Sequence, residues 1–458
     1  MNPLIFRAYD IRGIYGKDFD SQDAERIGKA FATFLKPKTV VVGHDNRESS
    51  PVIKKSIIEG LVSSGVRVID VGMVPTPVLY YAIIKLGASG GIMITASHLT
   101  GEWNGFKLCR RNAVALAGEE IQEVRKLVEN ENFIEAPGTI EKYDIVLEYV
   151  KEIKEKINFR KKLKVVFDFG NGTVGPVMKK ILENENIEPI FLFDEPDSSF
   201  PNHWPDPAEE ENLKELRRII KEEKADMGIA FDGDGDRTFF LDETGRIIRG
   251  DQALAILSED VLQSKKEKVL YEVKCSRLLE EWIRKHGGEP IMYKTGHSFI
   301  MKKMMEDPAI LLAGEMSGHL YFKDFYSIDD GTHAAIRLVS FLTSQQKSLS
   351  DLVNELPHYF STPELRLPVD DEKKFEIIEN VKKEILSIAQ GAKIIDIDGI
   401  RLELKNGWGL LRASNTSPYL IARFEGKTPE DMKKIYDMFS SVLFEYGVPL
   451  PPLETGLS

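Results

Sequence analysis

The sequence has little cysteine, no excess of positive charge and no long apolar run, and each shortage argues against a class of protein. Cys109 and Cys275 are its two cysteines in 458 residues, too few for a disulfide scaffold, so we expect reduced thiols. The net charge of -12 argues against non-specific binding to nucleic acid or anionic membranes. No apolar run approaches the ~20 residues that span a bilayer. The first residues also lack the apolar core of a signal peptide. We therefore expect a cytoplasmic protein with a small-molecule substrate.

Short apolar, β-branched runs alternate with amphipathic stretches, which is typical of α/β units with mostly parallel sheets. The length itself predicts about three or four domains. Three blocks repeat this plan, and in each the last strand runs into a polar loop that contains glycine. The expected strands are 39–45, 66–72, 91–97, 163–172, 189–193, 227–237, 268–273, 289–296 and 309–318.

The last part of the chain follows another pattern. A helix is expected at 371–385, a strand at 392–404 and a final helix at 428–446, which indicates a separate α+β domain. We therefore predict three α/β domains with mixed, mostly parallel sheets, followed by a smaller α+β domain. The predicted bounds are 1–152, 153–249, 250–362 and 363–458.

The stretch "DGDGDR" is the most specific chemical signal. Asp232, Asp234 and Asp236 alternate with glycines, so the backbone can bend until three carboxylates converge, and these would repel one another without a cation. Mg²⁺ prefers such oxygen ligands. An EF-hand is excluded because Arg237 stands where that loop needs glycine. A solvated acidic turn is the remaining alternative.

Three further segments, the loop "GEMSGH" and the strand ends at Lys274 and His297, carry groups that suit a sugar phosphate. In "GEMSGH", Glu315 and Ser317 would point the same way if the loop is extended and could bind vicinal hydroxyls, with His319 as a third contact. Lys274 and His297 each place a cation at a strand end. Without the other loops, each of these residues would be read as a polar turn or a solvent-facing side chain.

The stretch "RASNTSP" is a candidate phosphate cradle. Its arginine offers a bidentate fork, its short polar side chains offer further donors, and a second arginine lies seven residues after the threonine. The alternative is a plain polar loop. The candidate residues are Arg412, Ser414, Asn415, Thr416 and Arg423.

Ser97, in "ITASHLTGEWNGFK", follows an apolar run and precedes Lys107 by ten positions. The pattern G-x-S-x-G is absent, so a serine hydrolase is poorly supported, and a helix cap is the structural alternative. A serine near three carboxylates suits phosphoryl transfer, which needs positioning and charge neutralisation. Arg7 and Arg12, in "FRAYDIRG", could supply positive charge or lie on the surface.

Five ordered motifs, "FRAYDIRG", "TASH…NGFK", "DGDGDR", "GEMSGH" and "RASNTSP", run nearly the length of the chain. Together they resemble the alpha-D-phosphohexomutases, in the phosphomannomutase/phosphoglucomutase branch. The resemblance implies three related α/β domains and a smaller α+β domain around one central cleft. It also implies that Ser97 donates and regains a phosphoryl group beside His98, and that the three aspartates hold Mg²⁺ together with the serine phosphate.

The resemblance assigns further roles around these groups. Arg12 and Lys107 would give charge or acid/base help, and Arg237 would steady the phosphoryl group. Glu315, Ser317 and His319 would bind the sugar. Lys274 and His297 would contact the sugar phosphate. The phosphate that is not transferred would be held by Arg412, Ser414, Asn415, Thr416 and Arg423.

The implied reaction interconverts hexose 1-phosphate and hexose 6-phosphate, of glucose, mannose or both, with a hexose 1,6-bisphosphate as intermediate and activator. Met316 favours these sugars over glucosamine phosphate, whose mutases tend to carry Gln there. Phosphoglucosamine mutase, bisphosphate synthase, phosphatase and a non-catalytic sugar-phosphate binder are the alternatives. Leu99 and Thr100 depart from the usual Asn-Pro after "TASH" and remove the restraint of a proline on this loop. A monomer and a homodimer are both compatible with the sequence.

Overall fold

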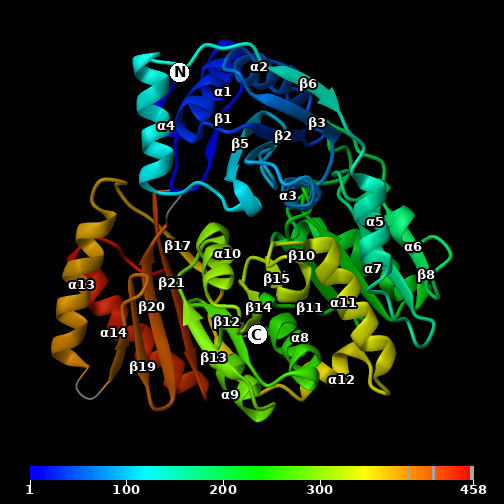
Figure 1. The fold of residues 1–458 in the computed structure, drawn as a ribbon. Helices are drawn as coiled ribbons and strands as arrows, with labels where there is room; N and C mark the ends of the chain where they lie inside the picture. The colour runs from blue at the N-terminus through cyan, green and yellow to red at the C-terminus, as the bar shows by residue number, and fades with distance from the viewer. Residues whose placement is uncertain (390–391, 415–417, 454–458) are drawn as a thin grey trace.

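The computed structural model describes residues 1–389, 392–414 and 418–453. Four β-sheets follow one another along the chain, each covered by helices, and the four units surround a central region (Figure 1). The first three sheets are mixed with a parallel centre, and the fourth is antiparallel. The predicted fold class is thereby confirmed. Among the described residues, no helix is both long and apolar enough to cross a membrane.

The first sheet has the order β1-β5-β4-β2-β3-β6. Its central strands β2 and β4 are buried on both faces, which explains why they read as continuous apolar runs. The strands are β1 (Ile11–Ile14), β2 (Thr39–His44), β3 (Arg67–Met73), β4 (Gly90–Ile94), β5 (Trp103–Arg110) and β6 (Thr139–Lys142). The helices are α1 (Ser21–Leu35), α2 (Ser50–Ser63), α3 (Thr76–Lys85) and α4 (Glu119–Asn130).

The second and third sheets repeat this plan. The second has the order β11-β10-β9-β7-β8 and the third β13-β12-β14-β15. The strands are β7 (Lys164–Asp168), β8 (Glu188–Leu192), β9 (Met227–Phe231), β10 (Thr238–Asp242), β11 (Ile247–Ile248), β12 (Lys268–Glu272), β13 (Glu289–Tyr293), β14 (Ile310–Gly314) and β15 (Leu320–Phe322). The helices are α5 (Val146–Lys154), α6 (Gly175–Leu182), α7 (Lys214–Glu223), α8 (Gly250–Ser264), α9 (Leu278–Lys285), α10 (His297–Glu306), α11 (Gly331–Ser344) and α12 (Leu349–Asn354).

The three α/β units share one strand order. In β4-β2-β3, β9-β7-β8 and β14-β12-β13, the third strand of the unit lies beside the first, which lies beside the second. In each unit the third strand then pairs with an antiparallel neighbour, β5, β10 or β15. The loop between these two strands therefore has the same topological position three times, which agrees with the predicted repeat of polar loops.

The fourth sheet forms the tail of the chain, orange to red in Figure 1. It has the order β16-β21-β20-β19-β18, with β17 also paired to β21. The strands are β16 (Phe360–Ser361), β17 (Leu365–Pro368), β18 (Lys393–Ile395), β19 (Ile400–Leu404), β20 (Gly407–Ala413) and β21 (Tyr419–Gly426), and the helices are α13 (Lys374–Ile388) and α14 (Pro429–Glu445). Short 3₁₀ turns lie at Pro3–Ile5, Arg111–Ala113, Glu210–Leu213 and Lys323–Phe325.

The tail has an apolar core of its own, whereas one continuous core runs through parts of the first, second and third units. A small cluster of Val273, Trp408 and Leu410 joins the tail to the third unit. The predicted domain bounds stay a prediction, and α5 runs across the bound placed after residue 152.

Two sequence expectations are wrong in detail. The expected strand 392–404 is a hairpin of β18 and β19, because the chain turns at Gly399 with φ +76. The expected strands 91–97, 163–172, 227–237 and 309–318 end three to six residues earlier, where polar residues form turns. The antiparallel strands β5, β10 and β15 were not predicted. Strand β5 mixes polar and apolar residues without a clear alternation, and β10 and β15 are runs of only five and three residues.

Candidate active site

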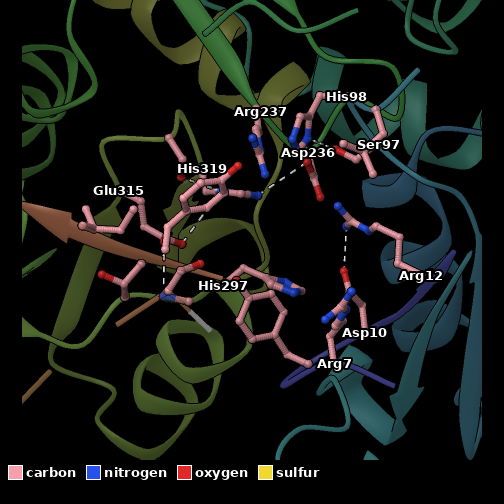
Figure 2. Close-up of a pocket in the computed structure, with 18 of the residues that line it drawn as sticks. Arg7, Asp10, Arg12, Ser97, His98, Asp236, Arg237, His297, Glu315 and His319 are labelled. Carbon is pink, nitrogen blue, oxygen red and sulfur yellow. Dashed lines mark hydrogen bonds and ion pairs between the residues drawn. The ribbon is translucent and has the colours of Figure 1, made fainter. Parts of the chain in front are cut away.

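The loops that follow β4, β9 and β14 meet at a cleft of about 530 Å³, which the tail closes on one side (Figure 2). Most of the residues expected from the sequence line this cleft. They are Arg12, Ser97, His98, Lys107, Asp236, Arg237, Lys274, His297, Glu315, Ser317, His319, Arg412 and Ser414. The structure thus brings together groups that lie up to 400 positions apart in the sequence.

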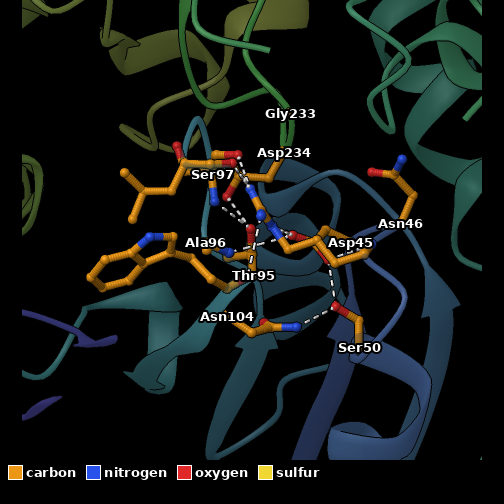
Figure 3. A network of polar contacts seen from close by, with 12 residues as sticks. Asp45, Asn46, Ser50, Thr95, Ala96, Ser97, Asn104, Gly233 and Asp234 are labelled. Atoms are coloured by element: carbon orange, nitrogen blue, oxygen red, sulfur yellow. Dashed lines mark hydrogen bonds and ion pairs between the residues drawn. The ribbon is translucent and has the colours of Figure 1, made fainter. Parts of the chain in front are cut away.

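Ser97 lies in the loop after β4 and is buried. Its Oγ donates a hydrogen bond to Asp232 Oδ2 over 2.6 Å and lies 3.2 Å from His98 Nδ1. Its backbone N–H donates to Thr95 Oγ1 at 2.9 Å, and Thr95 Oγ1 donates to Asp234 Oδ2 at 3.1 Å (Figure 3). No helix begins in the described segment between β4 and β5, so Ser97 is not a helix cap.

The three aspartates of "DGDGDR" converge as predicted. Each offers an oxygen within 4.8 Å of the others, and all three side chains are buried, which excludes a solvated turn. Burial and the neighbouring carboxylates raise the pKa of Asp232. Oδ1 of Asp234 and Oδ1 of Asp236 have no hydrogen-bond partner within the described residues. Hard oxygen donors with unused lone pairs, crowded and buried, fit a divalent cation such as Mg²⁺.

Lys107 reaches this carboxylate group from β5, which pairs with β4 so that Lys107 lies opposite Met93. Its Nζ lies 2.8 Å from Asp234 Oδ2 and also contacts Asp236 Oδ2. Burial alone would lower the pKa of Lys107, but the charges of Asp234 and Asp236 outweigh burial and raise it. The ammonium therefore stays charged and offsets part of the negative charge of the cluster.

Two histidines flank the same carboxylates. His319 Nε2 lies 3.5 Å from Asp236 Oδ1, and its ring stacks on His297 with centroids 5.9 Å apart. Burial would lower the pKa of His319, but Asp236 raises it, whereas burial, followed by the charge of Lys107, lowers the pKa of His297. The pKa values of these two neighbouring imidazoles are thus shifted in opposite directions.

The loop "GEMSGH" after β14 forms a turn, in which Gly318 N–H donates to Glu315 O. It is therefore not the extended segment for which we expected Glu315 and Ser317 to point the same way. Glu315 and Ser317 nevertheless both line the cleft. The Glu315 carboxylate accepts from Tyr321 Oη at 2.7 Å and from Gly296 N at 3.2 Å. The turn therefore fixes the carboxylate on the side of the cleft opposite Arg12 (Figure 2).

The tail supplies the candidate phosphate cradle. Arg412 lies on β20 and its Nε donates to Asp398 Oδ2 at 2.9 Å. Lys274 Nζ lies 2.9 Å from Glu364 Oε2. Ser414 lines the cleft, and Asn415 and Thr416 lie outside the described residues. Arg423 is not among the lining residues. Its Nη1 donates to Lys274 O at 2.6 Å, which holds the backbone on which Lys274 stands.

Several residues of the site escaped sequence reasoning. Tyr9 lines the cleft and its ring meets His297 edge-on at 5.3 Å; it lies within "FRAYDIRG", and that motif was the available signal. Glu364 and Arg366 also line the cleft. Asp329 is buried with an oxygen 3.6 Å from His297 Nδ1 and 3.8 Å from His319 Nε2, and nothing in its local sequence indicates this.

Sequence and structure comparisons place the chain in a known family. Residues 3–135, 147–245 and 249–360 match alpha/beta/alpha domains I, II and III of phosphoglucomutase/phosphomannomutase, and residues 364–442 match the C-terminal domain. The chain therefore belongs to the phosphoglucomutase/phosphomannomutase family of enzymes.

Individual relatives agree over the whole length. A phosphomannomutase/phosphoglucomutase of Pseudomonas aeruginosa is 42% identical over 454 residues, which cover 98% of this chain and 97% of that protein. A phosphoglucomutase of Neisseria meningitidis serogroup A is 40% identical and covers 96% of both chains. The crystal structure of a phosphoglucomutase/phosphomannomutase family protein from Burkholderia thailandensis superposes with a TM-score of 0.92, at 39% identity, over 99% of this chain and 100% of that one.

Proposed function

We propose that this chain is a Mg²⁺-dependent phosphohexomutase that interconverts the 1- and 6-phosphates of glucose, mannose or both. Ser97 carries the phosphoryl group and a hexose 1,6-bisphosphate is the intermediate. The observation that carries this proposal is the 2.6 Å hydrogen bond from Ser97 Oγ to Asp232, within a buried group of three carboxylates. The activities named for its full-length relatives agree with it.

Asp232, Asp234 and Asp236 would hold Mg²⁺, which when bound supplies positive charge to the phosphoryl oxygens. In the first half-reaction, a sugar hydroxyl oxygen bonds to phosphorus as the bond to Ser97 Oγ breaks, and one proton moves from the hydroxyl to the serine side. The second half-reaction returns the other phosphoryl group to Ser97 by the reverse exchange. Lys107 and Arg12 stabilise the charge on the group in transfer.

The intermediate has to reorient between the two half-reactions, so the cleft has to accept either end of the sugar. Glu315 and Ser317 bind the sugar hydroxyls from the third unit. Lys274, Arg412 and Ser414 hold the distant phosphate, with Arg423 supporting Lys274 through its carbonyl. Closure of the tail over the cleft excludes water and suppresses loss of the phosphoryl group by hydrolysis.

The test is to incubate the protein with glucose 1-phosphate, a trace of glucose 1,6-bisphosphate and Mg²⁺. We expect glucose 6-phosphate. Release of inorganic phosphate without glucose 6-phosphate would indicate a phosphatase and contradict the proposal. Rates on mannose 1-phosphate and glucosamine 1-phosphate then define the sugar preference and separate the phosphoglucosamine mutase alternative.

The first prediction concerns the carrier itself. Ser97→Ala should abolish turnover and leave calorimetric binding of glucose 1-phosphate in place, because the sugar and distant-phosphate contacts come from other units. The matched control is Ser317→Ala, which should still take up a phosphoryl group on Ser97 and should weaken sugar binding. Turnover by the Ser97→Ala protein at the wild-type rate would refute the assignment.

A further inference from the structure

A buried arginine that does not line the cleft contacts the Ser97 loop. Arg47 is 1% exposed, and its guanidinium donates to four backbone carbonyls of the loop. Nη2 donates to Ser97 O at 2.8 Å and to Leu99 O at 2.6 Å. Nη1 donates to Thr100 O at 2.5 Å and to Trp103 O at 3.2 Å. One side chain therefore binds both ends of the loop between β4 and β5.

The guanidinium is itself fixed by a second set of bonds. Asp45 Oδ2 lies 3.0 Å from Arg47 Nε, and Asp45 Oδ1 accepts from Arg47 N at 3.0 Å and from Ser50 Oγ at 2.5 Å. Asp45 and Ser50 lie at the end of β2 and the start of α2, below Ser97 in Figure 3. The loop is thus tied through Arg47 to two regular elements of the first unit.

The loop needs such a restraint for two reasons. Ser97 has a φ of +52, a left-handed conformation that costs a residue other than glycine about 1–3 kcal/mol. Leu99 and Thr100 stand where Asn-Pro is usual in the phosphohexomutases that the chain resembles, so no proline restricts the turn here. The planar guanidinium of arginine can donate hydrogen bonds from both terminal nitrogens at once, whereas lysine has a single ammonium nitrogen.

We propose that Arg47 is a positioning residue, which holds the loop so that Ser97 Oγ faces Asp232. Arg47 does not line the cleft, so it acts through the loop residues whose carbonyls it binds, Ser97 among them. This inference rests on the proposed role of Ser97 as phosphoryl carrier. It implies that weaker hydrogen bonds between Arg47 and the loop lower kcat and leave KM for glucose 1-phosphate nearly unchanged, because the sugar is bound by the third unit and the tail.

Arg47→Lys tests this second prediction. We expect kcat per phosphorylated enzyme, with phosphorylation measured by intact mass, to fall about 100-fold, since misplacement of a reacting atom by 1 Å can have that effect. Arg337→Lys is the control: Arg337 pairs with Asp260 and Asp324 on the far side of the third unit, so its loss lowers stability without touching the loop. A wild-type kcat in Arg47→Lys, with only the melting temperature reduced, would overturn the proposal.

A second variant covers the case in which Arg47→Lys does not fold. Asp45→Asn keeps the arginine but removes the charge that anchors it, and we expect a smaller fall in kcat, again at nearly constant KM. A rise in KM at constant kcat in this variant contradicts the inference. If wild-type enzyme treated with glucose 1,6-bisphosphate gains no phosphoryl mass on Ser97, the proposed function itself fails, and that result is independent of both variants.

Discussion

At the residue scale, the contacts around Ser97 hold its backbone in an unfavourable conformation. Its left-handed backbone and its burial are both unfavourable for an isolated serine, and strain of this kind persists where surrounding contacts fix it. Gly233 packs against the same residue so closely that a Cβ there would lie 2.7 Å from Ser97 O. The serine is thus held between Arg47 and the loop that carries the three aspartates.

The third prediction concerns the two residues in which this loop departs from the family pattern. Leu99→Asn with Thr100→Pro should raise the free energy of unfolding by about 0.4–1 kcal/mol, because proline restricts the unfolded chain. Most of the turnover should remain, since Arg47 binds carbonyl oxygens, which both changes keep. Urea unfolding and steady-state rates measure the two effects. A loss of turnover similar to that of Arg47→Lys would show that Leu99 or Thr100 is itself required.

At the residue scale, sequence reasoning found those groups that stand in short motifs at strand ends. The aspartates of "DGDGDR" and Glu315 could be located because parallel strands bring their carboxyl ends to one edge. Arg47 could not be found in this way, because its four partners lie 50 or more positions away. Asp329 was missed for a different reason: its neighbours His297 and His319 are closer in the sequence, but they stand in separate segments and no motif links them to Asp329.

At the scale of elements, helix α11 begins at a buried carboxyl group. Asp330 is its N-cap and accepts from His333 N at 2.8 Å. Tyr149 Oη, on α5, donates to both oxygens of Asp330 at 3.0 and 2.8 Å. Burial raises the pKa of Asp330 to about 7, so this cap binds a proton that an unfolded chain would release near pH 4.

The fourth prediction follows from this carboxyl group. Because its pKa is higher in the folded state, its contribution to stability is full below about pH 4 and is lost as the pH rises through 7. Asp330→Asn keeps an N-cap acceptor and removes the titration. The stability of wild type relative to this variant should fall, by up to about 4 kcal/mol, between pH 4 and pH 8. Urea unfolding across this range measures it.

The matched control for this titration is Asp20→Asn, the same change at the exposed N-cap of α1. This variant measures what the change from carboxylate to amide does at an N-cap outside the core. A constant difference in unfolding free energy between wild type and Asp330→Asn, from pH 4 to pH 8, would contradict the raised pKa.

Sequence reasoning at this scale succeeded for elements that are buried on both faces and failed at hairpins. The parallel strands β2, β7 and β12 read as continuous apolar runs. The hairpin of β18 and β19 was read as one strand although Asp398 and Gly399 stand in its turn, and Asp-Gly is a strong hairpin signal. Strand β5, which carries Lys107, has no regular alternation that could have revealed it.

At the scale of the molecule, polar contacts join the tail to the third unit beside the apolar cluster of Val273, Trp408 and Leu410. Arg401 donates to Cys275 O at 2.7 Å, and Arg423 donates to Lys274 O at 2.6 Å. Asp398 Oδ2 accepts from Thr295 N at 3.0 Å and from Arg412 at 2.9 Å. Because the tail has a core of its own, it is suited to move as a body over the cleft.

The fifth prediction tests this junction. Asp398→Asn keeps an acceptor for Thr295 N–H but removes the charge that orients Arg412. The KM for glucose 1-phosphate should rise about tenfold, equivalent to about 1.4 kcal/mol of binding, while kcat changes less because Ser97 is untouched. Steady-state kinetics measure both constants.

The control for the junction is Asp396→Asn in the same hairpin, where Asp396 pairs with Lys382 on the surface of the tail. This variant should behave like wild type. A KM that is unchanged or lowered in Asp398→Asn would show that Asp398 does not orient Arg412 for the phosphate contact proposed above.

The strand order shared by the three α/β units has a consequence for how such an enzyme can arise. Duplication of one unit supplies three equivalent loops. Once these loops face a common cleft, each can specialise in one part of the site. One loop here carries Ser97, the next the three carboxylates and the third Glu315 and Ser317. Specialisation of the copies of one ancestral unit is sufficient to account for this arrangement, and no new fold has to arise.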